Sequence, residues 1–249
     1  MTGFLKLCSI LLLITLTAGC SGKSQQTPEQ DAMKSFKSAE RLLEQGLWED
    51  AISAWEQVRD SYYTPELSML AELKIADTYF VSERYSEAAV SYKEFLRRYP
   101  DDSRAPTVLF RLGQSYYRQI LSRDRDQTNA RMALNTFEEF LRKYPDDLNA
   151  DQAAQLALRA RTRLADHEVY VGRFYLQRKE YQAAIERLEN ILSKFPDYYF
   201  RDEALFFLGR AYIGAGKNDQ AQQVLEQLVE DFPTSDYHDN AVKMLPVEK

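Results

Sequence analysis

The sequence predicts an all-α protein, an α-solenoid of about five stacked helix pairs. One pattern of apolar residues at helical spacing recurs five times, beginning at Trp48, Tyr85, Ala130, Tyr181 and Asn218. A second helical segment precedes each copy, and the last four copies end in an aromatic residue followed by proline. One helix pair leaves an apolar face uncovered, so the pairs must stack on one another to bury it.

The N-terminus has the composition of a secretory signal peptide, which we expect to cover residues 1–19. Lys6 precedes an apolar run over 7–16, which is too short to cross a bilayer core of about 30 Å as a helix. The run leads to Leu-Thr-Ala-Gly-Cys, which resembles the lipobox of bacterial lipoproteins, where the cysteine is acylated. This resemblance implies that Cys20 carries a diacylglycerol and an N-acyl chain. The alternative is an ordinary signal peptide with a chance cysteine.

Residues 20–31 are polar and lack periodicity, so we expect the lipidated cysteine to be followed by a flexible tether. In bacterial lipoproteins an aspartate after the cysteine often marks inner-membrane retention. Ser21 stands there, and the resemblance therefore implies the outer membrane. The chain has a formal net charge of −6 and no clustered basic stripe, which argues against a nucleic-acid partner because phosphate neutralisation dominates such binding.

The repeat is built on small and aromatic residues at fixed spacing. An alanine lies three residues after each copy's start: Ala51, Ala88, Ala133, Ala184 and Ala221. The preceding helix carries a small residue with an aromatic three residues later: Ala76 and Tyr79, Gly113 and Tyr116, Gly172 and Tyr175, Gly209 and Tyr212. Small residues let two helices approach closely, and proline ends the second helix because its ring cannot continue the helical ladder. This grid resembles the tetratricopeptide (TPR) repeat.

Two segments depart from a plain array. About eight extra residues fall near Arg118–Asp126 in the third copy. Between the third and fourth copies the sequence stays compatible with a helix through most of 147–180, which predicts one long first helix, or two in line, for the fourth repeat.

Catalysis has little support in the sequence. His167 and His238 lie far apart, without the spacing of a metal-binding helix face. The acidic pairs 101–102 and 146–147 follow Tyr-Pro in the turns. We expect them to cap the next helix rather than to form a catalytic pair.

In a TPR superhelix the first helix of each pair lines the concave face, and the groove suits extended peptides. Counting helical positions predicts these peptide-binding side chains: Phe36, Leu73, Asp77, Phe80, Phe110, Gln114 and Tyr117. Further along, Arg173 and Arg210 are candidates for holding a carboxylate of a partner. The alternative for each of these residues is packing against neighbouring helices.

Residues 164–196, LADHEVYVGRFYLQRKEYQAAIERLENILSKFP, resemble the signature of the BamD (ComL) family of outer-membrane assembly lipoproteins. FEEFLRKYPDD at 137–147, the five repeats and the lipobox match as well. The resemblance implies a non-enzymatic scaffold of the β-barrel assembly (BAM) complex, anchored by lipid on the periplasmic side of the outer membrane. Its implied partners are the POTRA domain of the insertase BamA, the targeting strand of unfolded barrel proteins, and accessory BAM lipoproteins.

The family assigns substrate to the N-terminal repeats, here 32–147, and BamA to the C-terminal repeats, here 148–249. On that basis Arg201, with Arg173 and Arg210, is a candidate for the BamA side. A TPR lipoprotein adaptor for peptidoglycan enzymes would share the anchor and the fold, so this alternative stays open. A peptidoglycan hydrolase is the weakest alternative.

Overall fold

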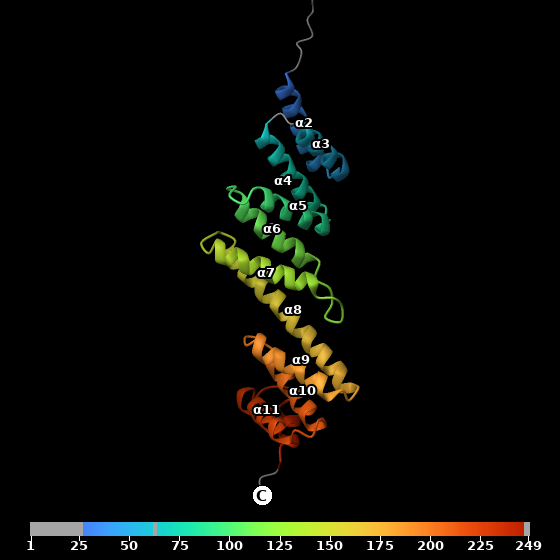
Figure 1. Ribbon diagram of the computed structural model, residues 1–249, viewed down its shortest axis with the longest axis vertical. Coiled ribbons are helices and arrows are strands. Elements are labelled where there is room, and N and C mark those ends of the chain that lie inside the picture. The colour runs from blue at the N-terminus through green and yellow to red at the C-terminus, as the bar shows by residue number, and fades with distance from the viewer. Residues whose placement is uncertain (1–26, 62–63, 247–249) are drawn as a thin grey trace, which may run out of the picture. The chain divides into compact units, whose positions relative to one another are not determined.

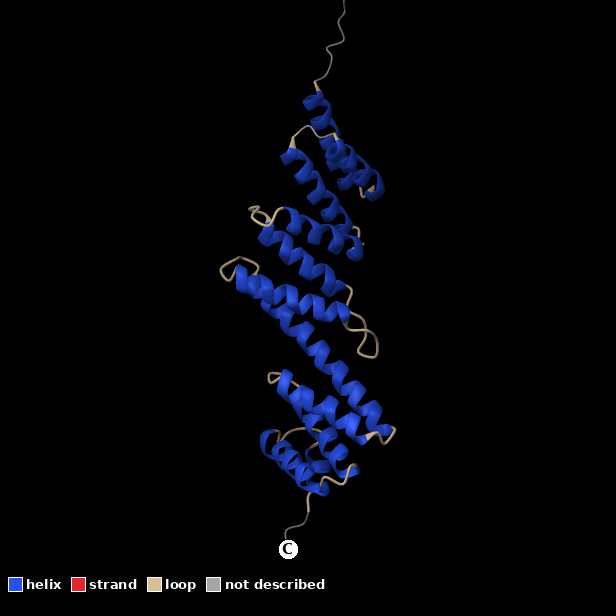
Figure 2. Ribbon diagram, in the orientation of Figure 1, coloured by secondary structure: helices blue, strands red, loops and turns tan. Residues whose placement is uncertain are grey.

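The computed structural model describes residues 27–61 and 64–246, which form eleven helices and no strand (Figures 1 and 2). The predicted all-α class is thus confirmed. The helices are α2 (Pro28–Glu44), α3 (Trp48–Asp60), α4 (Pro65–Val81), α5 (Tyr85–Arg98), α6 (Ala105–Arg118), α7 (Thr128–Lys143), α8 (Ala150–Gln177), α9 (Tyr181–Lys194), α10 (Arg201–Gly214), α11 (Asn218–Asp231) and α12 (His238–Met244). They fall into two compact units that divide within α4, between Ala71 and Glu72.

The first unit is built on the α2–α3 hairpin. α2 begins with a capping box. The Gln30 backbone N–H donates to the Thr27 hydroxyl, and the Thr27 backbone N–H donates to the Gln30 side-chain oxygen. Trp55 of α3 is fully buried and meets Phe36 of α2 edge to face, with ring centroids 4.8 Å apart. This aromatic pair fixes how the hairpin closes.

In the second unit each helix from α5 onward packs against the next one along the chain. α5, α9 and α11 begin at the residues expected from the repeat, and α7 begins two residues earlier than expected. α8 is one continuous helix of 28 residues, drawn in yellow and gold in Figure 1. This confirms the long first helix predicted for the fourth repeat. The residues inserted before α7 form a loop over 119–127.

Three glycines set the distance between paired helices. A Cβ atom on Gly113 would lie 2.6 Å from a ring carbon of Phe137, and one on Gly209 would lie 2.6 Å from Leu225. Gly172 stands in the same relation to Leu188, at 2.7 Å. Real Cβ atoms do not approach so closely, so a larger residue at these positions requires the facing side chain or the helix to shift. The structure therefore confirms that small residues allow the close approach.

Asp102 and Asp147, in the turns after Tyr-Pro, do not cap the next helix as the sequence predicts. Asp102 accepts a hydrogen bond from the backbone N–H of Arg104 at 2.9 Å, and Asp147 accepts one from that of Asn149 at 2.8 Å. Arg104 and Asn149 are themselves the residues that precede the first turns of α6 and α8, and neither helix has a side-chain cap. The prediction of helix capping was wrong: these carboxylates stabilise the turn before the helix. Hydrogen bonds from the Arg104 side chain also hold the pKa of Asp102 at about 2.

Buried tyrosines donate to carboxylates at three places in the second unit. Tyr92 donates to Asp77 at 2.7 Å, Tyr198 to Asp166 at 2.7 Å, and Tyr212 to Glu189. Burial, followed by the carboxylate interaction, raises the pKa of all three hydroxyls, that of Tyr212 to about 12.

These tyrosines predict a loss of stability in alkali. A pKa of Tyr212 raised above its unfolded value of about 10 contributes stability that is complete below about pH 10 and is lost as pH rises through about 12. We expect Tyr212→Phe to weaken the fall in free energy of unfolding between about pH 10 and pH 12, measured by urea denaturation. Tyr199→Phe is the control because Tyr199 is 81% exposed. If the free energy of unfolding fell equally steeply with pH in the wild type and in Tyr212→Phe, the Tyr212 hydroxyl would not be a source of the alkaline loss of stability.

Within the described ranges, no helix is long and apolar enough to cross a membrane. The same residues contain no group of three or more His, Cys, Asp or Glu side chains placed to hold a metal ion. Cys20 and the predicted signal peptide lie outside the described residues.

Candidate binding sites in the second unit

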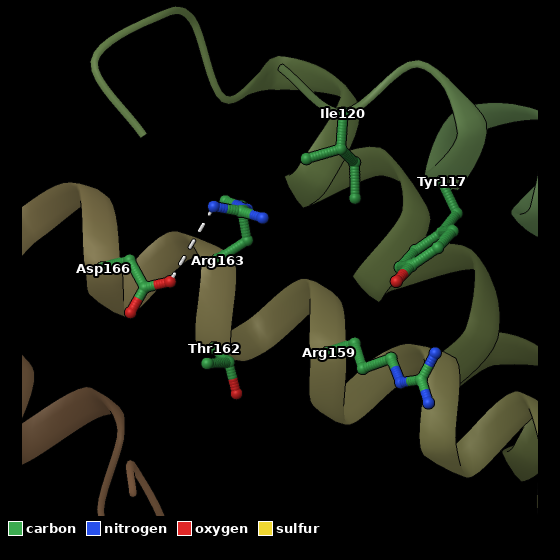
Figure 3. Close-up of a pocket in the computed structure, with 6 residues that line it drawn as sticks. All are labelled: Tyr117, Ile120, Arg159, Thr162, Arg163 and Asp166. Carbon is green, nitrogen blue, oxygen red and sulfur yellow. Dashed lines mark ion pairs between the residues drawn. The ribbon is translucent and has the colours of Figure 1, made fainter. Parts of the chain in front are cut away.

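A pocket of about 420 Å³ lies between the C-terminal end of α6 and the middle of α8. We call it the α6–α8 pocket; it is lined by Tyr117, Ile120, Arg159, Thr162, Arg163 and Asp166. Figure 3 shows Tyr117 and Ile120 projecting from the α6 side, and the guanidinium groups of Arg159 and Arg163 on the α8 side.

The inserted loop forms one wall of this pocket. Ile120 begins the loop directly after α6. The Gln127 amide donates to the carbonyls of Ser122 and Arg125, both at 2.9 Å, and this closes the loop on itself. The Arg123 carbonyl lies 2.7 Å from Nδ1 of His167, which ties the loop to α8. His167, which the sequence left without a role, therefore positions the loop.

The opposite wall is one face of α8. Arg159, Thr162, Arg163 and Asp166 recur at helical spacing, so they share a face. The Thr162 hydroxyl donates to the Leu158 carbonyl at 3.0 Å. Asp166 is held on both sides, since Oδ1 accepts from the Tyr198 hydroxyl and Oδ2 lies 4.0 Å from Nη1 of Arg163.

Of the residues predicted to bind peptide, Tyr117 lines this pocket, whereas Leu73 and Phe110 are only 9% and 5% exposed. Phe110 packs against Phe137 and Phe140 of α7, with ring centroids 6.0 and 5.6 Å away. The expectation that Phe110 and Leu73 line an open groove is corrected, because neighbouring side chains cover both; the packing alternative describes them.

The other predicted groove residues have mixed surroundings. Asp77 is engaged by Tyr92 and by an ion pair with Arg111. Phe80 packs edge-on against Tyr85 at 5.5 Å, and Phe36 packs on Trp55 within the first unit. Gln114 is half-buried. Their part in peptide binding stays a prediction.

A second hollow, of about 580 Å³, lies at the C-terminal repeats. We call it the C-terminal cleft; it is lined by Tyr199, Phe200, Asp202, Glu203, Phe232, Thr234, Ser235, Asp236 and Tyr237. Tyr199 and Phe200 are 81% and 46% exposed, and their rings meet edge to face at 5.0 Å. Aromatic residues are enriched at protein interfaces, so this cleft is a candidate interaction surface.

The three arginines expected on the partner side lie around this cleft without lining it. Arg173 forms an ion pair with Glu203 at 2.8 Å and covers the ring of Phe207 at 4.5 Å. Arg210 lies 5.8 Å from the rings of Phe206 and Phe207. Arg201 donates to the Pro196 carbonyl at 3.1 Å. Glu203 already pairs with Nη1 of Arg173. The part of the three arginines in binding a partner stays a prediction.

The α8 face of the α6–α8 pocket was not among the sites predicted from the sequence. On this helix the sequence prediction named only Arg173. Helical steps of seven, three and four residues backward from Arg173 reach Asp166, Arg163 and Arg159 in turn. The signal was therefore present in the long helix, upstream of the repeat pattern.

Three curated proteins similar to this chain are each named outer membrane protein assembly factor BamD. The one from Caulobacter vibrioides is 25% identical over 239 residues, covering 94% of this chain and 78% of its own. The one from Rickettsia prowazekii is 26% identical over 243 residues and covers 96% of both chains. The one from Vibrio cholerae is 25% identical, covering 90% of this chain and 96% of its own.

Solved structures of helical repeat proteins also align, with TM-scores below 0.5. The TPR2AB-domain:pHSP90-complex of yeast Sti1 aligns with 10% identity and a TM-score of 0.43, over 82% of this chain and 79% of that one. A thermophilic TPR protein in Thermus thermophilus aligns with 18% identity and a TM-score of 0.36, over 86% of this chain and 98% of that one.

The YfiO family, described as outer membrane lipoprotein, matches residues 28–226, which include the whole lining of the α6–α8 pocket and the four residues of the C-terminal cleft from Tyr199 to Glu203. That match covers far more than half of the 249 residues. The chain therefore belongs to the YfiO family of outer membrane lipoproteins, to which the resemblance to BamD pointed.

Proposed function

We propose that this protein is a scaffold and receptor of the β-barrel assembly complex, held at the periplasmic face of the outer membrane by lipid on Cys20. The family match over residues 28–226 carries this proposal. The relatives from three bacteria, all named for outer membrane protein assembly, support it.

The two hollows of the second unit give the proposal its geometry. The α6–α8 pocket sets the aromatic Tyr117 and the apolar Ile120 opposite four polar side chains of α8, a combination that can contact both the side chains and the polar groups of an extended peptide. We assign it to the targeting strand of unfolded barrel proteins. The C-terminal cleft, with its exposed Tyr199 and Phe200, is assigned to the periplasmic POTRA domain of BamA.

In this mechanism the protein works by binding alone. Side chains of the α6–α8 pocket hold a client strand, while the C-terminal cleft holds the insertase. Both surfaces belong to one compact unit, so a bound client is kept at high local concentration near the insertase. Positioning of this kind requires no covalent step by the scaffold.

Co-purification tests the proposal. We expect the tagged, lipidated protein, extracted in mild detergent, to recover a POTRA-bearing barrel protein near one-to-one, identified by mass spectrometry. Cys20→Ser is the matched control: it should keep the folded helices and leave the membrane fraction. Recovery of cell-wall synthases or peptidases without any such barrel protein would replace the proposal by the peptidoglycan-adaptor alternative.

A further inference from the structure

We infer that the α6–α8 pocket binds a carboxylate group of an extended peptide, held by Arg159 and Arg163 of α8. This inference rests on the proposed receptor function, and it names the chemical group that the receptor recognises. The two arginines are four residues apart on one helix face, and both line the same hollow. In Figure 3 the Arg163 guanidinium lies beside Asp166, and that of Arg159 lies toward Tyr117, so the hollow has a guanidinium near each end of its α8 wall.

The charge of Arg159 is not compensated. Within the described residues it has no ion-pair or hydrogen-bond partner, and the residue is exposed. Other arginines of α8 are paired: Arg161 lies 2.9 Å from Glu138 and Arg173 lies 2.8 Å from Glu203. Arg159 is thus a guanidinium that faces a pocket and lacks the glutamate that its neighbours have.

Arg163 is only weakly engaged. Its partner Asp166 lies 4.0 Å away, at the outer limit of an ion pair. The other carboxylate oxygen of Asp166 accepts the Tyr198 hydroxyl at 2.7 Å, which holds the aspartate toward the turn before α10. The pocket lining therefore contains two guanidinium groups and one carboxylate, which Tyr198 already engages. The net charge of the lining is positive.

The chemistry of arginine selects the ligand. A guanidinium offers planar, parallel N–H donors that match a carboxylate, and such charge-assisted bonds are stronger than neutral ones. Tyr117 and Ile120, on the opposite wall, provide an apolar contact for the side chain next to that carboxylate. A carboxylate beside an apolar or aromatic residue occurs at the end of a chain, as the free α-carboxylate, or inside it, on an Asp or Glu side chain.

Binding of labelled peptides to the full-length protein, measured by fluorescence anisotropy, tests the inference. The probe is a short peptide of alternating polar and apolar residues that ends in phenylalanine with a free carboxylate. We expect its affinity to fall about ten- to a hundredfold when the carboxylate is replaced by an amide. A third peptide, amidated but with a glutamate before the phenylalanine, distinguishes the two sources: recovered affinity assigns the site to a side-chain carboxylate, and no recovery assigns it to the chain end.

Variants of α8 locate the effect. Arg159→Gln with Arg163→Gln should reduce the affinity for the free-acid peptide to that for the amide, and the corresponding double lysine variant should retain part of it because charge remains without the planar fork. Arg161→Gln is the matched control, since this arginine is on the same helix but pairs with Glu138 of α7. Circular dichroism checks that each variant folds.

Two results would overturn the inference. One is equal affinity of the wild type for the acid and amide peptides, including no measurable binding of either. The other is a double glutamine variant that binds the acid peptide as tightly as Arg161→Gln does. The receptor function would still stand in either case if the protein continued to co-purify with the barrel insertase and its clients, so the two failures are distinguishable.

Discussion

Phe137→Ala is expected to lower the free energy of unfolding by about 3–5 kcal/mol, the usual cost of removing a buried aromatic ring. Phe137 is fully buried and fills the space that Gly113 leaves between α6 and α7. Its ring also meets that of Phe110. Adjacent repeats depend on one another for stability, so the loss should also weaken the packing of α8 on α7. Urea denaturation followed by circular dichroism measures the change.

Combining Phe137→Ala with Gly113→Ala tests whether the two residues contact each other. Gly113→Ala alone should destabilise the protein by about 1–3 kcal/mol, because its Cβ would lie against the Phe137 ring. In the Phe137→Ala background the obstructing ring is absent, and alanine is preferred over glycine inside a helix by about 0.5–1 kcal/mol. The two effects should therefore couple strongly. Additive free energies would show that the helix spacing does not depend on this contact.

Phe174→Ala is the matched control for the ring deletion. Phe174 is 42% exposed on α8 and has Arg178 over its ring at 4.5 Å. Its removal should cost no more than about 1 kcal/mol, the scale of an exposed cation–π contact. A loss equal to that of Phe137→Ala would contradict the difference in burial.

The repeat spacing predicts the helix pairs because the same physical contact recurs. Gly113, Gly172 and Gly209 each face the apolar residue four positions after the repeat alanine. Proline ends the second helix of each of the last four repeats, and α5 stops at Arg98, two residues before Pro100. Periodicity of this kind is local and can be read directly from the chain.

The sites depend on contacts that periodicity does not encode. Tyr198 reaches Asp166 from 32 positions away in the sequence, and Glu203 reaches Arg173 from 30. Whether an arginine is paired or free is decided by such distant partners, which is why Arg173 was expected to bind a carboxylate and Arg159 was overlooked. Phe110 was expected to line an open groove, yet it is buried because α7 covers it with two phenylalanines.

The C-terminal cleft gives the second large expected effect. If it holds the insertase, replacing both Tyr199 and Phe200 by alanine should weaken binding of the purified POTRA domain at least about thirtyfold, because exposed aromatics at the centre of an interface act as hot spots of about 2 kcal/mol or more. Titration calorimetry or anisotropy with the labelled domain measures this. Both side chains are exposed, Tyr199 by 81%, so the fold should be retained.

Phe174→Ala again serves as the control, since it removes an exposed aromatic of the same size from α8 rather than from the cleft.

The cleft's lining contains three carboxylates, Asp202, Glu203 and Asp236, and no lysine or arginine. A partner surface that fits it should therefore be basic around an apolar centre, and binding should weaken with added salt. Unchanged affinity in the Tyr199→Ala/Phe200→Ala variant would move the insertase away from this cleft. It would leave the client pocket unaffected, because Arg159 and Arg163 belong to a different hollow of the same unit.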